Sequence, residues 1–203
     1  GDYSDAVHYF GRFLPRSGIK SSRNKIIIFI KFIYDFIKVV IALYLPSKIR
    51  KIIPNSRDNE LFDIRHKNIL ALTVVNPTRS LTEGINTIKN SFRYDLRKLS
   101  TGYSMTLGGS GLFGFSGLSL KLSKKFLEYA EIVIDKTNFK ELFMFNYFKM
   151  LHNHWSGNWG DIKEYDDYLL RQNLDFGLFW EISTYLNYYG MVLNDQGKFY
   201  SVV

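Results

Sequence analysis

The chain has 203 residues, of which 46% are hydrophobic and 17% aromatic, with a formal net charge of +8 and no cysteine. This apolar content is enough for a folded core, and it excludes an intrinsically disordered, collagen-like or low-complexity chain. The lack of cysteine excludes disulfide scaffolds, cysteine-based zinc sites, iron–sulfur clusters and thiol catalysis.

The positive charge is concentrated near the N-terminus. Residues 1–57 hold eleven Lys or Arg and three Asp or Glu, which gives +8, whereas residues 58–203 hold sixteen of each and are neutral. We therefore expect a basic N-terminal segment, residues 1–57, and a charge-balanced body, residues 58–203. A basic surface attracts nucleic acid, anionic lipid or an acidic partner, and Lys48, Arg50 and Lys51 are its candidate residues. The alternative is that these side chains solubilise an apolar helix and contact another part of a larger protein.

Residues 26–45 predict one long helix, because the run is almost wholly apolar and contains no helix breaker. Lys31, Asp35 and Lys38 interrupt it at positions i, i+4 and i+7, which places them on one face. We expect a helix that is buried on its other sides and turns this narrow polar stripe toward water.

The ends of this helix carry their own signals. Ser21 and Ser22 are candidate N-caps, and the helix should end before Pro46. An interfacial helix and a membrane-spanning helix are the alternatives, and each charged side chain at the bilayer centre would cost roughly 2.5–3.5 kcal/mol. We do not expect a signal peptide, because the apolar run begins late and no small-residue cleavage site follows it.

Turn residues recur in the body at a spacing of 40: Gly117, Gly157 and Gly197, with Pro77 one step earlier. We call these four residues the turn markers. A helical pattern follows each of the first three, and the chain ends shortly after the fourth. The stretches that precede the four markers also predict helices, at residues 61–75, 94–109, 140–155 and 179–193. Asp95 and Thr137–Asn138 are candidate caps for two of them.

Helix pairs that repeat every 30 to 50 residues stack into a solenoid, because one pair cannot bury its apolar face alone. No segment shows the sustained alternation of a β-strand. The expected fold is therefore all-α, a right-handed solenoid of helical hairpins with about 3.5 pairs and a long N-terminal helix. The aromatic residues of the body are expected to form the core between helices, with some tyrosines on a concave binding surface.

The turns Gly157-Asn158-Trp159 and Gly197-Lys198-Phe199, each with an apolar helix behind it, resemble the middle of a tetratricopeptide repeat. The resemblance implies that Gly157 lets two helices approach closely and that the ring of Trp159 fills the seam between repeats. The expected turn and packing residues are thus Pro77, Gly117, Gly157, Trp159, Gly197 and Phe199.

A second resemblance involves the N-terminal part. Residues 10–17 (FGRFLPRS), the apolar helix, the basic segment between Pro46 and Pro54, and residues 76–79 (NPTR) follow one another in this order. The order is similar to the helical region of large bacterial signalling ATPases, in which an AAA/STAND-type nucleotide-binding module precedes tetratricopeptide-like repeats and the same chain carries a cyclase or kinase domain. The resemblance implies a scaffold whose catalytic motifs lie in other domains.

The chemical motifs of the chain are weak. Residues 109–114 (GSGLFG) match G-x-G-x-x-G, but the preceding residues 94–107 predict a helix where a dinucleotide site needs a strand, so we expect a flexible loop. His152 and His154 are two residues apart and fall on different sides of a helix, which does not suit a zinc site. Glu164 and Asp166–Asp167 are expected to form a solvated helix face.

Taken together, these features predict a cytoplasmic, non-catalytic protein-interaction and regulatory module without a cofactor or metal. Its partner would be a protein or peptide, another domain of the same chain or a second copy, since the helix expected at residues 179–193 would leave one face uncovered. The alternative is a membrane- or nucleic-acid-associated binding protein that uses residues 1–57.

Overall fold

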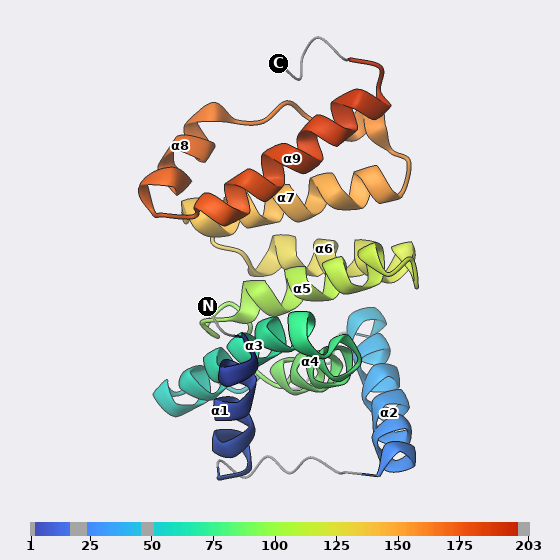
Figure 1. Ribbon diagram of the computed structural model, residues 1–203, viewed down its shortest axis with the longest axis vertical. Coiled ribbons are helices and arrows are strands. Elements are labelled where there is room, and N and C mark those ends of the chain that lie inside the picture. The colour runs from blue at the N-terminus through green and yellow to red at the C-terminus, as the bar shows by residue number, and fades with distance from the viewer. Residues whose placement is uncertain (1–2, 17–23, 46–50, 199–203) are drawn as a thin grey trace. The chain divides into compact units, whose positions relative to one another are not determined.

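A computed structural model of the chain describes residues 3–16, 24–45 and 51–198 (Figure 1). These residues form nine α-helices and one short 3-10 helix. The β-type pairing among them is an isolated bridge between Ile52 and Tyr94. The expected all-α class is confirmed.

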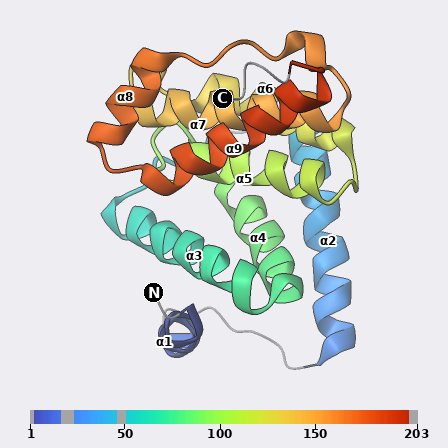
Figure 2. The same ribbon diagram turned by 45° about the horizontal axis from the view of Figure 1, so that its top comes forward.

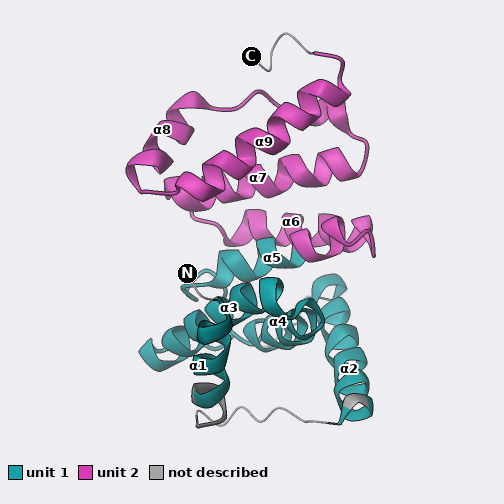
Figure 3. Cartoon of the chain, viewed as in Figure 1, with its two compact units in different colours: residues 1–109 teal, residues 110–203 magenta. Residues whose placement is uncertain are grey.

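The chain divides into two compact units, residues 1–109 and residues 110–203, and the division falls within helix α5, Gly102–Phe115 (Figure 3). The boundary expected from charge, between residues 57 and 58, does not coincide with it and falls in the first turn of α3, Ser56–Val75.

Unit 1 is built on the pair of α3 and α4, Pro77–Ser91. Helix α1, Tyr3–Arg16, packs on α3, and α2, Lys25–Tyr44, packs on α4 (Figures 1 and 2). Asn55 caps α3 in a capping box with Asp58. The buried apolar side chains of these four helices are Val39, Leu43, Phe62, Ala71, Leu72, Ile85 and Ile88.

The bounds of α2 agree with the helix predicted at residues 26–45, and the helix ends two residues before Pro46. The side chain of Asn24 caps it by accepting a hydrogen bond from the Ile26 amide at 2.9 Å. The predicted caps, Ser21 and Ser22, lie outside the described residues.

The predicted orientation of α2 is wrong for Asp35 and for the apolar side chains that were expected to be buried, whereas Lys31 and Lys38 are exposed as predicted. Asp35, expected on a polar stripe in water, is 2% exposed, whereas most of the apolar side chains on the opposite side of the helix are exposed. The reason lies on α4: Lys89 Nζ is 2.7 Å from one oxygen of the Asp35 carboxylate, and Asn86 Nδ2 donates to the other at 2.6 Å. A carboxylate with these two partners is tolerated in the interior, so Asp35 faces the protein while Lys31 and Lys38 stay in water.

Residues 94–101 and 109–114 also differ from the prediction. The first segment forms turns, α5 begins only at Gly102, and the glycine-rich residues 109–114 lie inside that helix and form no flexible loop. Asp95 is not a helix cap, because its amide donates to Ile52 and its side chain accepts from the Arg97 amide. These bonds, together with one from the Ser100 amide to the side chain of Asn59, hold the turns in place.

The glycines of α5 let aromatic rings of α7, Phe139–Trp155, lie directly against its backbone. A Cβ at Gly111 would lie 2.6 Å from Cε1 of Phe148, and a Cβ at Gly114 would lie 2.4 Å from Cε3 of Trp155. Close packing therefore explains the motif that resembles a dinucleotide-binding loop.

Unit 2 continues with α6, Leu120–Val133, then α7, the 3-10 helix η1, Trp159–Asp161, α8, Asp167–Asp175, and α9, Phe179–Asp195. Helix α7 contacts α6, α8, α9 and η1 and is the centre of the unit (Figure 3). The cap predicted at Asn138 is confirmed: its side chain accepts from the amides of Lys140 and Glu141.

A series of buried hydrogen bonds connects α5, α6 and α7 in unit 2. Ser123 Oγ on α6 lies 3.0 Å from Ser110 Oγ on α5 and 2.9 Å from Nδ1 of His152 on α7, and all three residues are buried. Burial lowers the pKa of His152, and the nearby positive charge of Lys124 lowers it further. The imidazole is therefore held in its neutral form and acts as part of the core.

Candidate functional site

The candidate site is a hollow on unit 2, over the middle of α7, with a volume of about 310 Å³. We call it the α7 groove. Helix α7 forms one side, the segment between η1 and α8 forms the other, and α8 and α9 contribute to the floor. Its lining residues are Phe143, Asn146, Lys149, Met150, Asn153, Asp161, Ile162, Lys163, Glu164, Asp166, Leu169, Leu170 and Tyr185.

The groove is open because α8 is short. Each interval of 40 residues between the turn markers holds two helices, α4 and α5, then α6 and α7, then α8 and α9. In the last interval α8 has only nine residues, since residues 162–166 are not helical and Asp166 caps the helix by accepting from the Leu169 amide at 3.1 Å. Residues 162–166, which we call the strap, therefore border the hollow as a non-helical segment, in the place where a longer α8 would begin.

Hydrogen bonds hold the η1 end of this strap. Asn153 Nδ2 on α7 donates to the carbonyl oxygen of Asp161 at 3.4 Å, and Gln196 Nε2, after α9, donates to the carbonyl oxygen of Trp159 at 2.8 Å. The strap is thus fixed to α7 and to the end of α9, and the groove between it and α7 is already formed in the free chain.

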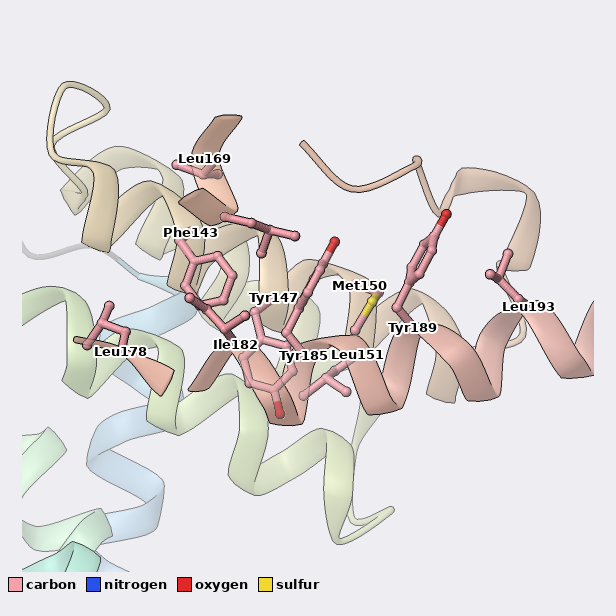
Figure 4. Packing of buried hydrophobic residues seen from close by; sticks show 11 residues of the cluster. Phe143, Tyr147, Met150, Leu151, Leu169, Leu178, Ile182, Tyr185, Tyr189 and Leu193 are labelled. Carbon is pink, nitrogen blue, oxygen red and sulfur yellow. The ribbon is translucent and has the colours of Figure 1, made fainter. Parts of the chain in front are cut away.

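The floor of the groove is apolar and aromatic. Figure 4 shows Phe143, Met150 and Tyr185 within the buried cluster that joins α7, α8 and α9. The ring of Tyr185 meets the rings of Phe143 and Tyr147 edge to face, with centroids 5.5 and 5.8 Å apart. The full cluster comprises Phe143, Tyr147, Met150, Leu151, Leu169, Leu170, Leu178, Ile182, Tyr185, Tyr189 and Leu193.

The buried hydroxyls of Tyr147 and Tyr185 in this cluster stay protonated, and Tyr185 is the one that lines the groove. Burial raises the pKa of Tyr185 to about 12, and the neighbouring Tyr189 and Asp166 act in the same direction. Burial raises the pKa of Tyr147 above its ordinary value as well, with a further contribution from Tyr188. Tyr185 therefore presents a neutral ring and hydroxyl to a bound molecule.

The rim of the groove is polar on both sides. Asn146, Lys149 and Asn153 recur along α7 at i, i+3 and i+7, so they lie in one row above the floor. Lys163 and Glu164 face them from the strap, and Lys149, Lys163 and Glu164 form no ion pair with other described residues. The rim thus offers amide, ammonium and carboxylate groups within reach of one apolar floor.

The turn markers named from the sequence lie at helix junctions. Pro77 is the first residue of α4, directly after Asn76, whose side chain caps that helix. Gly117, Gly157 and Gly197 have φ angles of +68°, +74° and +73°, a region that glycine adopts without strain.

The packing expected at these turns differs from that observed. Nothing lies within 4 Å of a Cβ placed at Gly157, so this glycine supplies a backbone conformation and not a close approach between helices. Trp159 is 39% exposed, and its indole nitrogen donates to the carbonyl oxygen of His154 at 3.2 Å. Phe199 lies outside the described residues.

Of the candidate basic residues, Lys48 and Arg50 lie outside the described residues. Lys51 is half-buried, and its ammonium donates to the carbonyl oxygen of Phe92 in unit 1. Lys51 is therefore engaged within the fold.

The polar row on α7 that borders the groove was not predicted from the sequence. Asn146, Lys149 and Asn153 interrupt an otherwise largely apolar helix at helical spacing, and this is the signal that could have indicated a binding face. The histidine pair is explained by structure: His152 is buried against Ser123, and His154 Nδ1 lies 3.8 Å from the carboxylate of Asp195. Within the described residues, no group of three or more His, Asp or Glu is arranged to hold a metal ion.

Among the helices of the described residues, none combines the length and the apolarity that crossing a membrane requires. Comparison of the chain with protein-family models, with curated proteins and with solved structures gives no significant match. The α7 groove is therefore interpreted from its own geometry.

Proposed function

We propose that the chain is a non-catalytic protein-interaction module that binds an extended peptide segment of a partner in the α7 groove. The observation that carries this proposal is the arrangement of the groove: a row of amide and ammonium side chains stands beside a buried aromatic floor that the short α8 leaves open.

The chemistry of the groove matches that of a peptide backbone. The side chain of Asn146 has both a donor and an acceptor, so it pairs with one peptide unit in the way that another backbone would. A hollow of about 310 Å³ accommodates one or two apolar side chains over Met150 and Tyr185. Lys149 and Lys163 on the rim favour a segment with a carboxylate near those side chains.

The repeated two-helix arrangement supports the wider setting of the proposal. Helix pairs spaced by 40 residues are consistent with a divergent tetratricopeptide-like solenoid, a fold that presents elongated binding surfaces. On the resemblance of its N-terminal part, we further propose that the chain serves as a scaffold in a cytoplasmic bacterial signalling protein of the AAA/STAND type. Its partner is then a segment of another protein or of another domain of the same chain.

Association with nucleic acid through residues 1–57 has less support. Of the three basic residues that suggested it, the described one, Lys51, uses its ammonium to bind the Phe92 carbonyl. Lys48 and Arg50 lie outside the described residues, so no described observation supports a phosphate contact by these three residues, and we do not propose this function.

The proposal is tested by selecting dodecameric peptides from a random phage-displayed library on the full chain and measuring their affinity by fluorescence polarisation. Asn146→Ala combined with Lys149→Ala removes two hydrogen-bonding groups, and each bond is worth about 0.5–1.5 kcal/mol, so the loss of both should lower affinity at least about fivefold. Asn187→Ala, on the exposed side of α9 and outside the groove, is the matched control and should leave affinity unchanged. Selected peptides that bind the double variant as tightly as the wild-type chain would refute a site in this groove.

A further inference from the structure

Helix α2 carries an exposed apolar surface that the α7 groove does not explain. Six side chains on the side opposite Asp35 are 39–69% exposed, and we call them the outer band of α2: Ile26, Phe29, Ile30, Ile33, Ile37 and Ile41. At about 100° per residue they occupy a sector about 120° wide, which contains no charged residue and no hydrogen-bonding side chain between Ile26 and Ile41. Scattered exposed apolar residues are ordinary, whereas a continuous band of this kind marks an interaction surface.

The rotation of α2 about its own axis is fixed by a polar contact. Asp35 is held by Lys89 and Asn86 of α4, while Val39 and Leu43 pack on the same side and are buried. Turning the outer band toward α4 would take the Asp35 carboxylate away from both partners. The outward position of the band is therefore a property of the folded unit.

Charge indicates what covers the band. Lys31 and Lys38 are exposed and lie on one flank of α2, between the band and Asp35, and Asp35, the acidic residue of the helix, is paired with Lys89. The surrounding segment, residues 1–57, has a net charge of +8, whereas the rest of the chain is neutral. A second copy placed on this helix would bring two such segments together, so like-charge repulsion opposes a dimer and an anionic surface is favoured.

The composition of the band favours lipid over a protein partner. Energetically important contacts in protein interfaces are enriched in Trp, Tyr and Arg, which set the register through polar groups. The band consists of isoleucines and one phenylalanine, which offer apolar area without a polar group to orient a partner. Acyl chains require none, and lysines beside such a face reach the lipid headgroups.

We propose that the outer band of α2 lies in the surface of an anionic lipid bilayer, with the helix axis parallel to the membrane plane. The apolar side chains from Ile26 to Ile41 enter the boundary between headgroups and acyl chains over a length of about 23 Å. Lys31 and Lys38 contact the phosphates, and the Asp35 contact with Lys89 keeps unit 1 on the water side. This binding is independent of the peptide site proposed for unit 2.

The test uses the full chain and vesicles of equimolar phosphatidylglycerol and phosphatidylcholine in a flotation assay. The wild-type chain should float with these vesicles and much less with pure phosphatidylcholine, and binding should weaken with added salt. Ile33→Glu with Ile37→Glu should lower the partition coefficient at least about tenfold. Lys31→Glu with Lys38→Glu should lower it by a similar factor on the anionic vesicles alone.

Leu70→Glu with Val74→Glu provides the matched control. These residues are exposed apolar positions on α3 of the same unit, 54% and 65% exposed, and their replacement should leave the partition coefficient unchanged. Because the four target residues are exposed, all variants should keep the circular dichroism spectrum of the wild-type chain.

A site-specific probe locates the contact. The chain has no cysteine, so Ile33→Cys and Leu70→Cys each accept a single environment-sensitive fluorophore. The emission at position 33 should shift to the blue when anionic vesicles are added, and the emission at position 70 should not.

Three results would overturn the proposal: a folded chain that does not float with anionic vesicles, flotation that Ile33→Glu with Ile37→Glu leaves intact, or a fluorophore at position 33 that does not respond. Self-association in sedimentation velocity that the same two substitutions abolish, in a chain that does not float, would assign the band to a second copy.

Discussion

Substitution of Gly114 by Ala tests the close packing of α5 against α7. A Cβ at this position would lie 2.4 and 2.5 Å from Cε3 and Cζ3 of Trp155 and 3.1 Å from Oγ of Ser123. Neither neighbour moves freely, because the ring of Trp155 also meets that of Phe115 and Ser123 is hydrogen-bonded and buried. The added methyl group must therefore push the two helices apart or force the indole ring out of its position.

The expected magnitude follows from two opposing effects. Overpacking of a well-packed position costs about 1–3 kcal/mol, and replacing glycine by alanine in a helix returns up to about 1 kcal/mol. Gly108, in the same helix, is exposed, and a methyl group at this position would have no neighbour within 4 Å, so Gly108→Ala should stabilise the chain by about 0.5–1 kcal/mol. The same substitution at two positions of α5 should thus have opposite signs, with Gly114→Ala the less stable by about 1–3 kcal/mol.

Urea unfolding followed by far-ultraviolet circular dichroism measures both variants against the wild-type chain. For a chain of this length, a difference of about 2 kcal/mol corresponds to about 4–8 °C in Tm, which a thermal melt resolves. Trp155 fluorescence should also change in Gly114→Ala, because its ring is the nearest neighbour of the new methyl group. If Gly114→Ala proves as stable as Gly108→Ala, the close approach of α5 and α7 is refuted.

Two further predictions concern buried polar groups. Lys89→Met leaves the Asp35 carboxylate without its cation and should cost about 1–3 kcal/mol in urea unfolding, less than a fully buried pair because Lys89 is partly exposed; a wild-type midpoint would contradict this. The lowered pKa of His152 means that the unfolded chain takes up its proton first, so this contribution to stability is complete above about pH 6.5 and is lost as the pH falls below it. His152→Gln should flatten that part of the stability–pH curve, and an unchanged slope would show that another group controls it.

The helices that were predicted well are those fixed by local signals. The stretches 61–75, 140–155 and 179–193 agree with α3, α7 and α9 to within a few residues at most ends, because apolar spacing and caps such as Asn138 act within one turn of the helix. Residues 94–101 were assigned wrongly because the groups that hold them, Ile52 and Asn59, lie about 40 residues away in sequence.

The candidate site was harder to predict, because it depends on residues of α7 and on the length of α8 together, and neither alone indicates a groove. Asn146 and Lys149 are ordinary exposed residues of an amphipathic helix until the short α8 leaves the floor beside them open. The markers at Gly157 and Gly197 indicated where helices end, but Gly177 adds a further left-handed turn between α8 and α9 that the 40-residue spacing does not contain. The 40-residue spacing therefore indicated two helices in each interval but not how long each helix is, and it is the short length of α8 that opens the groove.

Helix α2 shows the same limit in its orientation. The spacing of Lys31, Asp35 and Lys38 establishes that they share a face, but spacing alone does not determine whether that face meets water or protein. The decision depends on Lys89 and Asn86, which lie three residues apart on α4 and more than fifty residues from Asp35. Because Lys89 and Asn86 hold Asp35 against α4, the isoleucines on the opposite side of α2 face away from α4 and are exposed, so the contact that stabilises unit 1 also leaves open the apolar surface for which we propose a lipid partner.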